Sequence, residues 1–259
     1  MELTLYQIDA FTSELFKGNP AAVCPLEEWL PDDKMQSIAN ENNLSETAFF
    51  VTKGTGFHIR WFTPTSEVDL CGHATLASAH VLFNILNYNS DKIEFESKSG
   101  ILTVIKDGEN LTLNFPAHSF SPCEIPKEII RAFNIEPIEC LESEDYIVLF
   151  NSESEIISAE PDLEQLNKLG LRGVIITARS DKYDFVARCF FPGIGIPEDP
   201  VTGSAYTQLA PYWAAKLGKT RFKAKQMSAR GGELTCELVN DRVLISGNAV
   251  KYLEGKINL

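Results

Sequence analysis

The sequence predicts an α+β protein made of two similar halves, residues 1–117 and 118–259, that face each other across a cleft. Short runs of alternating or β-branched residues, which are typical of strands, dominate both halves. Each half also contains one long segment that is apolar on nearly every face, as expected of a helix buried on all sides. A repeated strand-to-helix pattern is the third observation, and it links the two halves.

In the first half, a helix is expected at 31–42, where a proline stands near the start. Asp32 and Asp33 lie in its first turn, where the helix dipole favours acidic residues. The apolar helix of this half spans 72–86. Asp107-Gly108 is a hairpin-turn signal between two strands. The predicted strands are 3–11, 21–24, 47–51, 58–62, 92–96, 101–106 and 111–115.

The second half repeats this organisation. Its expected elements are short helices at 125–133 and 162–169, strands at 173–177 and 183–191, a long apolar helix at 203–217, and a run of strands within 221–250. Arg60-Trp61-Phe62-Thr63-Pro64 precedes the helix entry at Gly72, and Arg188-Cys189-Phe190-Phe191-Pro192 precedes the entry at Gly203. This repeat favours an ancient duplication over chance. The boundary at 117 leaves open whether the last strand packs back on the first half.

The composition excludes several classes of partner. With 23 Lys and Arg against 36 Asp and Glu, the net charge of −13 repels phosphate backbones and anionic lipid, so neither nucleic acid nor a membrane surface is expected. A small anionic substrate stays compatible, because a pocket can be locally positive. The N-terminus lacks a signal-peptide pattern and no apolar run approaches ~18 residues, so we expect a cytoplasmic protein. The six cysteines form no C-x-x-C pair and the histidines lack ligand spacing, which predicts reduced thiols and no metal site.

The two repeated helix entries are the first candidate for a ligand site. The N–H groups of a helix's first turn have no intrahelical partners and carry a partial positive charge, and glycine lets a ligand approach the backbone closely. Gly72 and Gly203 could therefore hold one carboxylate or oxyanion between them. The alternative is that both glycines only make turns, and the repetition favours the site.

Four polar side chains are further candidates for the site. His73 follows Gly72 and is expected to contact the substrate, and Ser204 adds a hydroxyl beside Gly203. Asp199 precedes a proline, which places it in the loop before the second helix, where it could orient a substrate. Glu46 stands at the start of a hydrophobic strand, where partial desolvation would raise its pKa toward neutrality and suit it to general acid–base work. An exposed loop glutamate is the alternative for Glu46.

Four stretches of the sequence, which together contain all of these candidate residues, resemble a known family. The stretches "GNPAAV" (18–23), "SETAFF" (45–50), "FTPTSEVDLCGHATLA" (62–77) and "EDPVTGSAYTQLAPYWAAKLGK" (198–219) are similar, in order and spacing, to the signature blocks of the phenazine-biosynthesis PhzF family. That family belongs to the diaminopimelate-epimerase-like superfamily. The resemblance implies two pseudo-symmetric halves, each a highly curved β-sheet around a central helix, and a homodimer that needs no cofactor.

The resemblance also implies roles for individual residues. Its catalytic glutamate corresponds to Glu46, its substrate-contacting histidine to His73, its aspartate to Asp199 and its serine to Ser204. The implied reaction is an isomerisation, in which a proton leaves one carbon and returns to another position or face. The substrate does not follow from the resemblance.

Two alternatives stay open. Racemases of the same superfamily use two cysteines, and Cys71 stands where the first would be. The repeat places Thr202 in the second position, and threonine cannot supply a thiolate near neutral pH. A single-base racemase that uses Cys71 is therefore the second choice. The other alternative is a small-anion-binding protein that needs no proton carrier.

Overall fold

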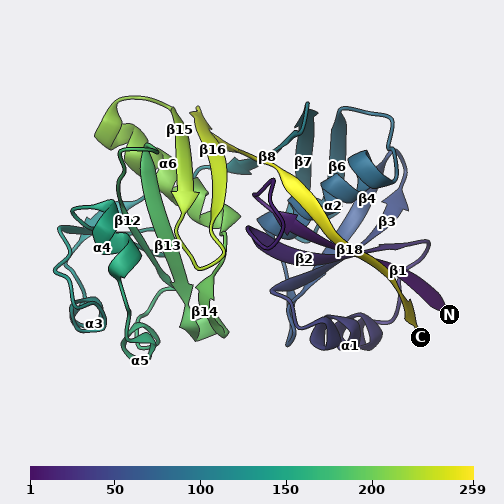
Figure 1. Cartoon of the computed structure of the whole chain (residues 1–259), viewed down its shortest axis with the longest axis horizontal. Coiled ribbons are helices and arrows are strands. Elements are labelled where there is room, and N and C mark those ends of the chain that lie inside the picture. The colour runs from purple at the N-terminus through teal and green to yellow at the C-terminus, as the bar shows by residue number, and fades with distance from the viewer. The chain divides into compact units, whose positions relative to one another are not determined.

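A computed structural model describes all 259 residues, and the chain divides into two compact units (Figure 1). The first unit contains residues 1–114 together with 246–259, and the second contains 115–245. The predicted fold class is confirmed: the protein is mostly sheet with few helices. None of the helices is long and apolar enough to cross a membrane.

The first unit is a mixed sheet with two helices. Its helices are α1 (Asp32–Asn42) and α2 (Gly72–His80), and α2 continues as one π-helical turn, η1 (Val81–Ile85). The chain's last strand, β18, pairs antiparallel with β1, and β1 pairs antiparallel with β2. The strands are β1 (Glu2–Ala10), β2 (Asn19–Leu26), β3 (Glu46–Lys53), β4 (Gly56–Phe62), β5 (Glu67–Val68), β6 (Lys92–Ser97), β7 (Gly100–Asp107), β8 (Asn110–Pro116) and β18 (Ala249–Asn258).

The second unit has nine strands and four α-helices. Its long helix is α6 (Gly203–Leu217), and the shorter ones are α3 (Lys127–Ala132), α4 (Glu153–Ser158) and α5 (Leu163–Leu166), with a 3-10 turn, η2 (Pro192–Ile194). The strands are β9 (Ser121–Cys123), β10 (Glu139–Glu142), β11 (Tyr146–Leu149), β12 (Val174–Arg179), β13 (Phe185–Phe191), β14 (Ile196–Asp199), β15 (Arg221–Gln226), β16 (Gly232–Val239) and β17 (Arg242–Gly247).

Strand pairing follows the same order in the two units. In the first, β2 and β3 are parallel, β3 and β4 antiparallel, β4 and β6 parallel, and β6 and β7 antiparallel. In the second, β11 and β12 are parallel, β12 and β13 antiparallel, β13 and β15 parallel, and β15 and β16 antiparallel. The short strands β5 and β14 pair antiparallel with β4 and β13. This shared topology supports the duplication that the repeated sequence pattern indicated.

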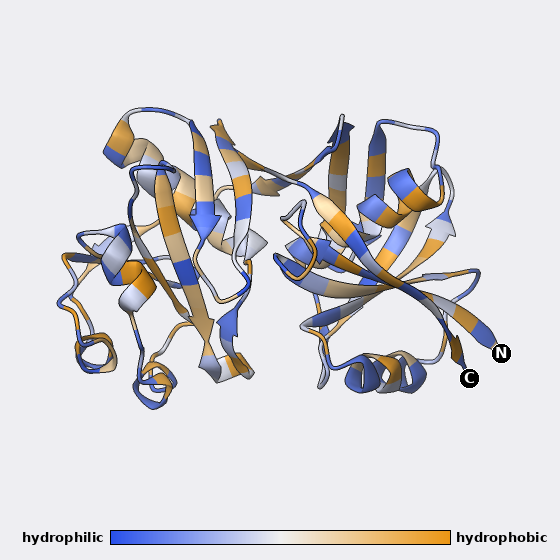
Figure 2. Cartoon of the chain, viewed as in Figure 1, coloured by the Kyte–Doolittle hydropathy of each residue, from blue (hydrophilic) through white to orange (hydrophobic).

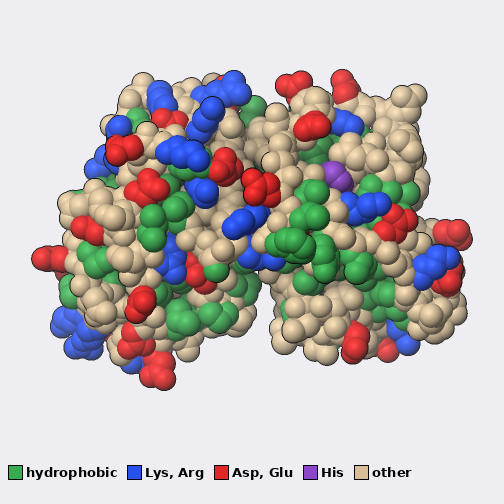
Figure 3. All heavy atoms as spheres, viewed as in Figure 1, with side chains coloured by type: hydrophobic (Ala, Val, Ile, Leu, Met, Phe, Trp, Pro, Cys, Tyr) green, Lys and Arg blue, Asp and Glu red, His purple; other side chains and the backbone are tan.

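The long helix of each unit is buried, as the sequence predicted. Every side chain of α2 from His73 to Ala79 is buried, and so is most of α6. An apolar helix without a polar face is stable only when it is covered on all sides. The small residues of these helices let the surrounding strands approach closely enough to cover them. The strands show the complementary alternation of buried and exposed residues, visible as hydrophobic and hydrophilic bands in Figure 2. On the face drawn in Figure 3, acidic and basic side chains are mixed, so this face presents no extended basic surface to a polyanion.

An arginine clamp recurs at equivalent places in the two units. Arg60 of β4 donates from Nε and Nη2 to the carboxylate of Glu67, at 2.7 and 2.9 Å. Arg188 of β13 does the same to Glu198, at 2.7 and 3.1 Å. Each clamp ties a long strand to the short strand before the buried helix. The repeated arginine of the sequence pattern is therefore structural.

The first clamp predicts a pH-dependent stability. Hydrogen bonds from Arg60 are the main cause that lowers the pKa of Glu67 to about 2, from 4.5. Since the folded state has the lower pKa, this carboxylate stabilises the fold above about pH 4.5 and loses that effect as pH falls toward 2. Glu67→Gln should lower the free energy of unfolding by about 1–2 kcal/mol at neutral pH. The difference from the wild type, measured by denaturant unfolding, should shrink in acid; a constant difference would contradict this account.

Most predicted elements are confirmed, and the second half shows what local patterns miss. Helix α6 has the predicted bounds, and α1 and β3 agree within one or two residues. The sequence did not predict β10, β11 or α4, which are only four to six residues long. Elements this short contain too few residues to display a period.

Candidate active site

Glu46 opens β3 and lies inside the first unit. Glu46 pairs with Ala21 of the parallel strand β2, and only 8% of its surface is exposed. The apolar residues that follow it in β3 are buried on both faces of the sheet. The alternative of an exposed loop glutamate is therefore wrong. The fold holds a carboxylate at the start of a strand whose first six residues are buried.

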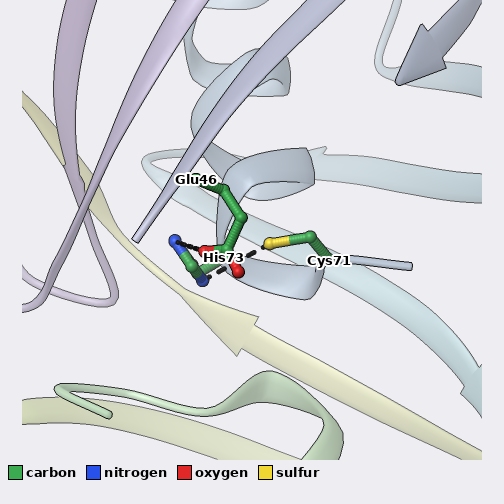
Figure 4. A group of neighbouring side chains, drawn as sticks. All are labelled: Glu46, Cys71 and His73. Carbon is green, nitrogen blue, oxygen red and sulfur yellow. Dashed lines mark hydrogen bonds and ion pairs between the residues drawn. The ribbon is translucent and has the colours of Figure 1, made fainter. Parts of the chain in front are cut away.

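His73 brings a second polar group to Glu46. It lies in the first turn of α2, after Cys71, whose extended backbone ends the preceding loop. The Cys71 carbonyl accepts from the Thr75 backbone N–H at 3.2 Å and from the Thr75 hydroxyl at 2.6 Å, which fixes the start of the helix. His73 Nε2 lies 3.1 Å from Glu46 Oε2, and its Nδ1 lies 3.6 Å from Cys71 Sγ (Figure 4). The imidazole thus stands between a carboxylate and a thiol.

The protonation of His73 follows from its surroundings. Asn19 of β2 is fully buried, and its Nδ2 lies 3.3 Å from His73 Nδ1. An amide nitrogen only donates, so Nδ1 accepts and the ring proton resides on Nε2, which faces Glu46. Burial lowers the pKa of His73 to about 3, so the ring is neutral near neutral pH. Nε2 and Oε2 are close without being well aligned as a hydrogen bond. Contacts of this kind often tighten when a ligand binds.

Asp199 belongs to the second unit and is held by a buried amide. It ends β14, whereas the sequence placed it in a loop, and it is 7% exposed. Its Oδ2 accepts from the Thr202 hydroxyl at 2.5 Å. The buried side chain of Gln226 donates to the Asp199 carbonyl at 2.7 Å and accepts from the Thr202 backbone N–H at 2.9 Å. These hydrogen bonds hold the segment between β14 and α6 at both Asp199 and Thr202.

Ser204 lies in the first turn of α6, directly after Gly203. Its Oγ accepts a hydrogen bond from Arg172 Nη2 at 3.2 Å. Because a guanidinium has only donors, the serine oxygen accepts here and its own proton is available to another acceptor. The arginine is held by two hydrogen bonds to Asp145, at 2.9 and 2.5 Å, and Asp145 is fully buried. This network points a hydroxyl donor away from the arginine.

Sequence reasoning missed Asn19, Arg172 and Asp145. Asn19 lies in the quoted block "GNPAAV", and the signal was a polar residue in an otherwise apolar strand. Arg172 and Asp145 are 27 residues apart and belong to no local pattern. Their importance follows from burial: a charge in the interior requires a partner.

The structure brings Glu46, Cys71 and His73 together in the first unit, with Gly72 between the last two. In the second unit it places Asp199, Gly203 and Ser204 within one short stretch around the start of α6. That residues of the two units act on one ligand stays a prediction. Cys71, His73 and Glu46 also form the one group whose chemistry suits a metal ion, and sequence spacing alone did not reveal it.

A hollow of about 510 Å³ also lies in the second unit, and it contains none of the predicted site residues. It adjoins the arginine network, because the carboxylate of Glu144 lies 3.2 Å from Arg172 Nη1. We assign it no part in the proposed reaction. Its other lining residues are His118, Ser119, Phe120, Ser121, Glu142 and Ser143.

Comparison with known proteins identifies the family. The family model described as phenazine biosynthesis-like protein, PhzC-PhzF, matches residues 8–255. The chain belongs to the PhzF family. A protein of Pseudomonas aeruginosa described as an uncharacterized isomerase is 51% identical to this PhzF-family chain over 259 residues, covering 100% of both. The crystal structure of a PhzF-family protein from Enterococcus faecalis, 46% identical, superimposes with a TM-score of 0.98 over 100% of both chains.

More distant structures share the fold of this PhzF-family chain. A probable proline racemase from Agrobacterium radiobacter matches with a TM-score of 0.67, covering 99% of this chain and 93% of the other, at 11% identity. At that identity the likeness concerns the fold alone.

Proposed function

We propose that the protein is a cofactor-independent isomerase that moves a proton on a carbon of a small carboxylic or amino acid. Glu46 is its general acid and base. The observation that carries the proposal is a buried carboxylate 3.1 Å from an imidazole that burial keeps neutral. A base shielded from water can take a proton from carbon and return it, which is the task of such an isomerase. The relatives described as uncharacterized isomerases support the same reaction class.

The other residues receive roles that follow from their chemistry. In this proposal, His73 donates from Nε2, as a neutral imidazole, to the substrate or to the glutamate. Gly72, Gly203 and the Ser204 hydroxyl supply donors for a substrate carboxylate, and Asp199 orients a hydroxyl or amine. We propose that these groups share one site, and that the protein is a homodimer, as family membership suggests.

Deuterium incorporation tests the proposal. The protein is incubated in D₂O with a panel of small carboxylic and amino acids, and carbon-bound deuterium is followed by NMR. An isomerase of this kind should introduce deuterium into at least one substrate class. A protein that binds members of the panel without any exchange would be the non-catalytic anion-binding protein instead.

A racemase that uses Cys71 is the second candidate, because the thiol lies 3.6 Å from the same imidazole. Cys71→Ser separates the two proposals. A Glu46-based isomerase should retain most of its exchange activity in this variant, since the serine preserves the packing at the start of α2. A thiol-based racemase should lose about 10²–10⁴-fold, the usual contribution of an acid–base group.

A further inference from the structure

Three different metal-binding groups meet at the start of α2. The carboxylate of Glu46, the thiol of Cys71 and the imidazole of His73 each offer a ligand atom, and these atoms all lie within 4.8 Å of one another (Figure 4). All three residues are buried. They come from two separate elements, β3 and the entry to α2, so their meeting is a product of the fold.

The spacing of two of these atoms matches a zinc site. Zinc binds thiolate sulfur at about 2.3 Å and imidazole nitrogen at about 2.0–2.1 Å in tetrahedral geometry, which places the two ligands roughly 3.6 Å apart. Cys71 Sγ and His73 Nδ1 lie 3.6 Å apart. An ion between them would replace the hydrogen bond from Asn19 to Nδ1. Glu46 Oε2 lies 3.1 Å from Nε2 of the same ring, and the carboxylate offers an oxygen within 4.8 Å of the other two ligand atoms, so a shift of this side chain would bring it to the same ion.

We propose that Glu46, Cys71 and His73 bind Zn²⁺, and that the bound ion inhibits the enzyme. A thiolate, an imidazole and a carboxylate are ligands that zinc accepts together, whereas Mg²⁺ and Ca²⁺ prefer oxygen. The ion would engage the carboxylate that carries the proton, which is why it inhibits. The inhibition rests on the proposed function; the binding does not.

Cobalt provides a direct test of binding. Co²⁺ occupies tetrahedral zinc sites, and a thiolate ligand gives it a charge-transfer absorbance in the near ultraviolet. Addition of Co²⁺ alone to the metal-free protein should produce this absorbance with one equivalent bound, and Zn²⁺ should abolish it by displacement. If no such absorbance develops, the three side chains do not form a metal site.

Variants assign the absorbance to this cluster. Cys71→Ser should eliminate it and weaken Zn²⁺ binding, measured by calorimetry, at least about tenfold. Glu46→Gln should retain the absorbance with weaker binding, because the thiolate remains. Cys123→Ser, which removes a more accessible thiol in the second unit, is the matched control and should bind Co²⁺ like the wild type. Absorbance that survives in Cys71→Ser or disappears in Cys123→Ser would place the metal elsewhere and overturn the proposal.

Inhibition is measured separately. Zn²⁺ at one equivalent should suppress deuterium exchange by the wild type, and EDTA should restore it. If Co²⁺ binds as described while no substrate ever exchanges, the proposed isomerase activity fails and the metal site stands. If exchange proceeds unchanged with Zn²⁺ bound, the inhibitory role is wrong although both the site and the enzyme are real.

Discussion

Glu46→Gln is expected to abolish deuterium exchange into the substrate while the protein stays folded. Glutamine keeps the shape of the side chain and its packing at the start of β3, where only 8% of the residue is exposed. It removes the group that accepts and returns the proton. Acid–base groups usually contribute 10²–10⁴-fold, so exchange should fall at least about a hundredfold. Exchange is measured by NMR in D₂O, and ligand binding and melting temperature should change little.

Glu67→Gln is the matched control for this experiment. It makes the same chemical change at a partly buried glutamate of the first unit that is held by Arg60 and lies outside the candidate site. It should lower stability and leave exchange intact below the melting temperature. An active Glu46→Gln enzyme combined with an inactive Cys71→Ser enzyme would assign the chemistry to the thiol.

Arg172→Met is expected to lower the free energy of unfolding more than any of the other single substitutions. Asp145 is fully buried, and Arg172 supplies the only positive charge among its hydrogen-bond donors. Removing the arginine leaves a buried carboxylate with a neutral donor from Gln208. Breaking a buried ion pair in this way usually costs about 3–5 kcal/mol, which denaturant unfolding would measure.

Two further variants test that explanation. Asp145→Asn combined with Arg172→Met removes the charge as well as its partner, so the double variant should recover part of the loss. Lys216→Met breaks an exposed pair with Glu139 on the same unit and should cost no more than about 1 kcal/mol. If Arg172→Met were as mild as Lys216→Met, the carboxylate of Asp145 would not depend on the arginine.

The sequence predicted those parts of the site that depend on local pattern. Glu46 could be placed because a carboxylate directly precedes a hydrophobic strand. Gly72 and Gly203 could be placed because each begins a helix after the same strand pattern. Both inferences use neighbours within a few residues, and the structure agrees with each position.

Contacts between distant residues could not be predicted in this way. Asn19 and His73 are 54 residues apart, and Arg172 and Ser204 are 32 apart. No period or motif connects such pairs, because the sheet register that joins them depends on the whole unit. The tautomer of His73 and the orientation of the Ser204 hydroxyl could therefore be assigned only from the folded structure.

The position of β18 has a consequence for synthesis. This strand comes last in the chain, yet it completes the first unit by pairing along β1 from Glu2 to Ala10. On the ribosome, all residues of the second unit emerge before the strand that the first unit still lacks. Until then one edge of β1 stays open, and an open strand edge is a template for pairing with another chain. The first unit is thus completed only after all residues of the second unit have been synthesised. A nascent chain paused after residue 245 would therefore carry an aggregation-prone strand edge.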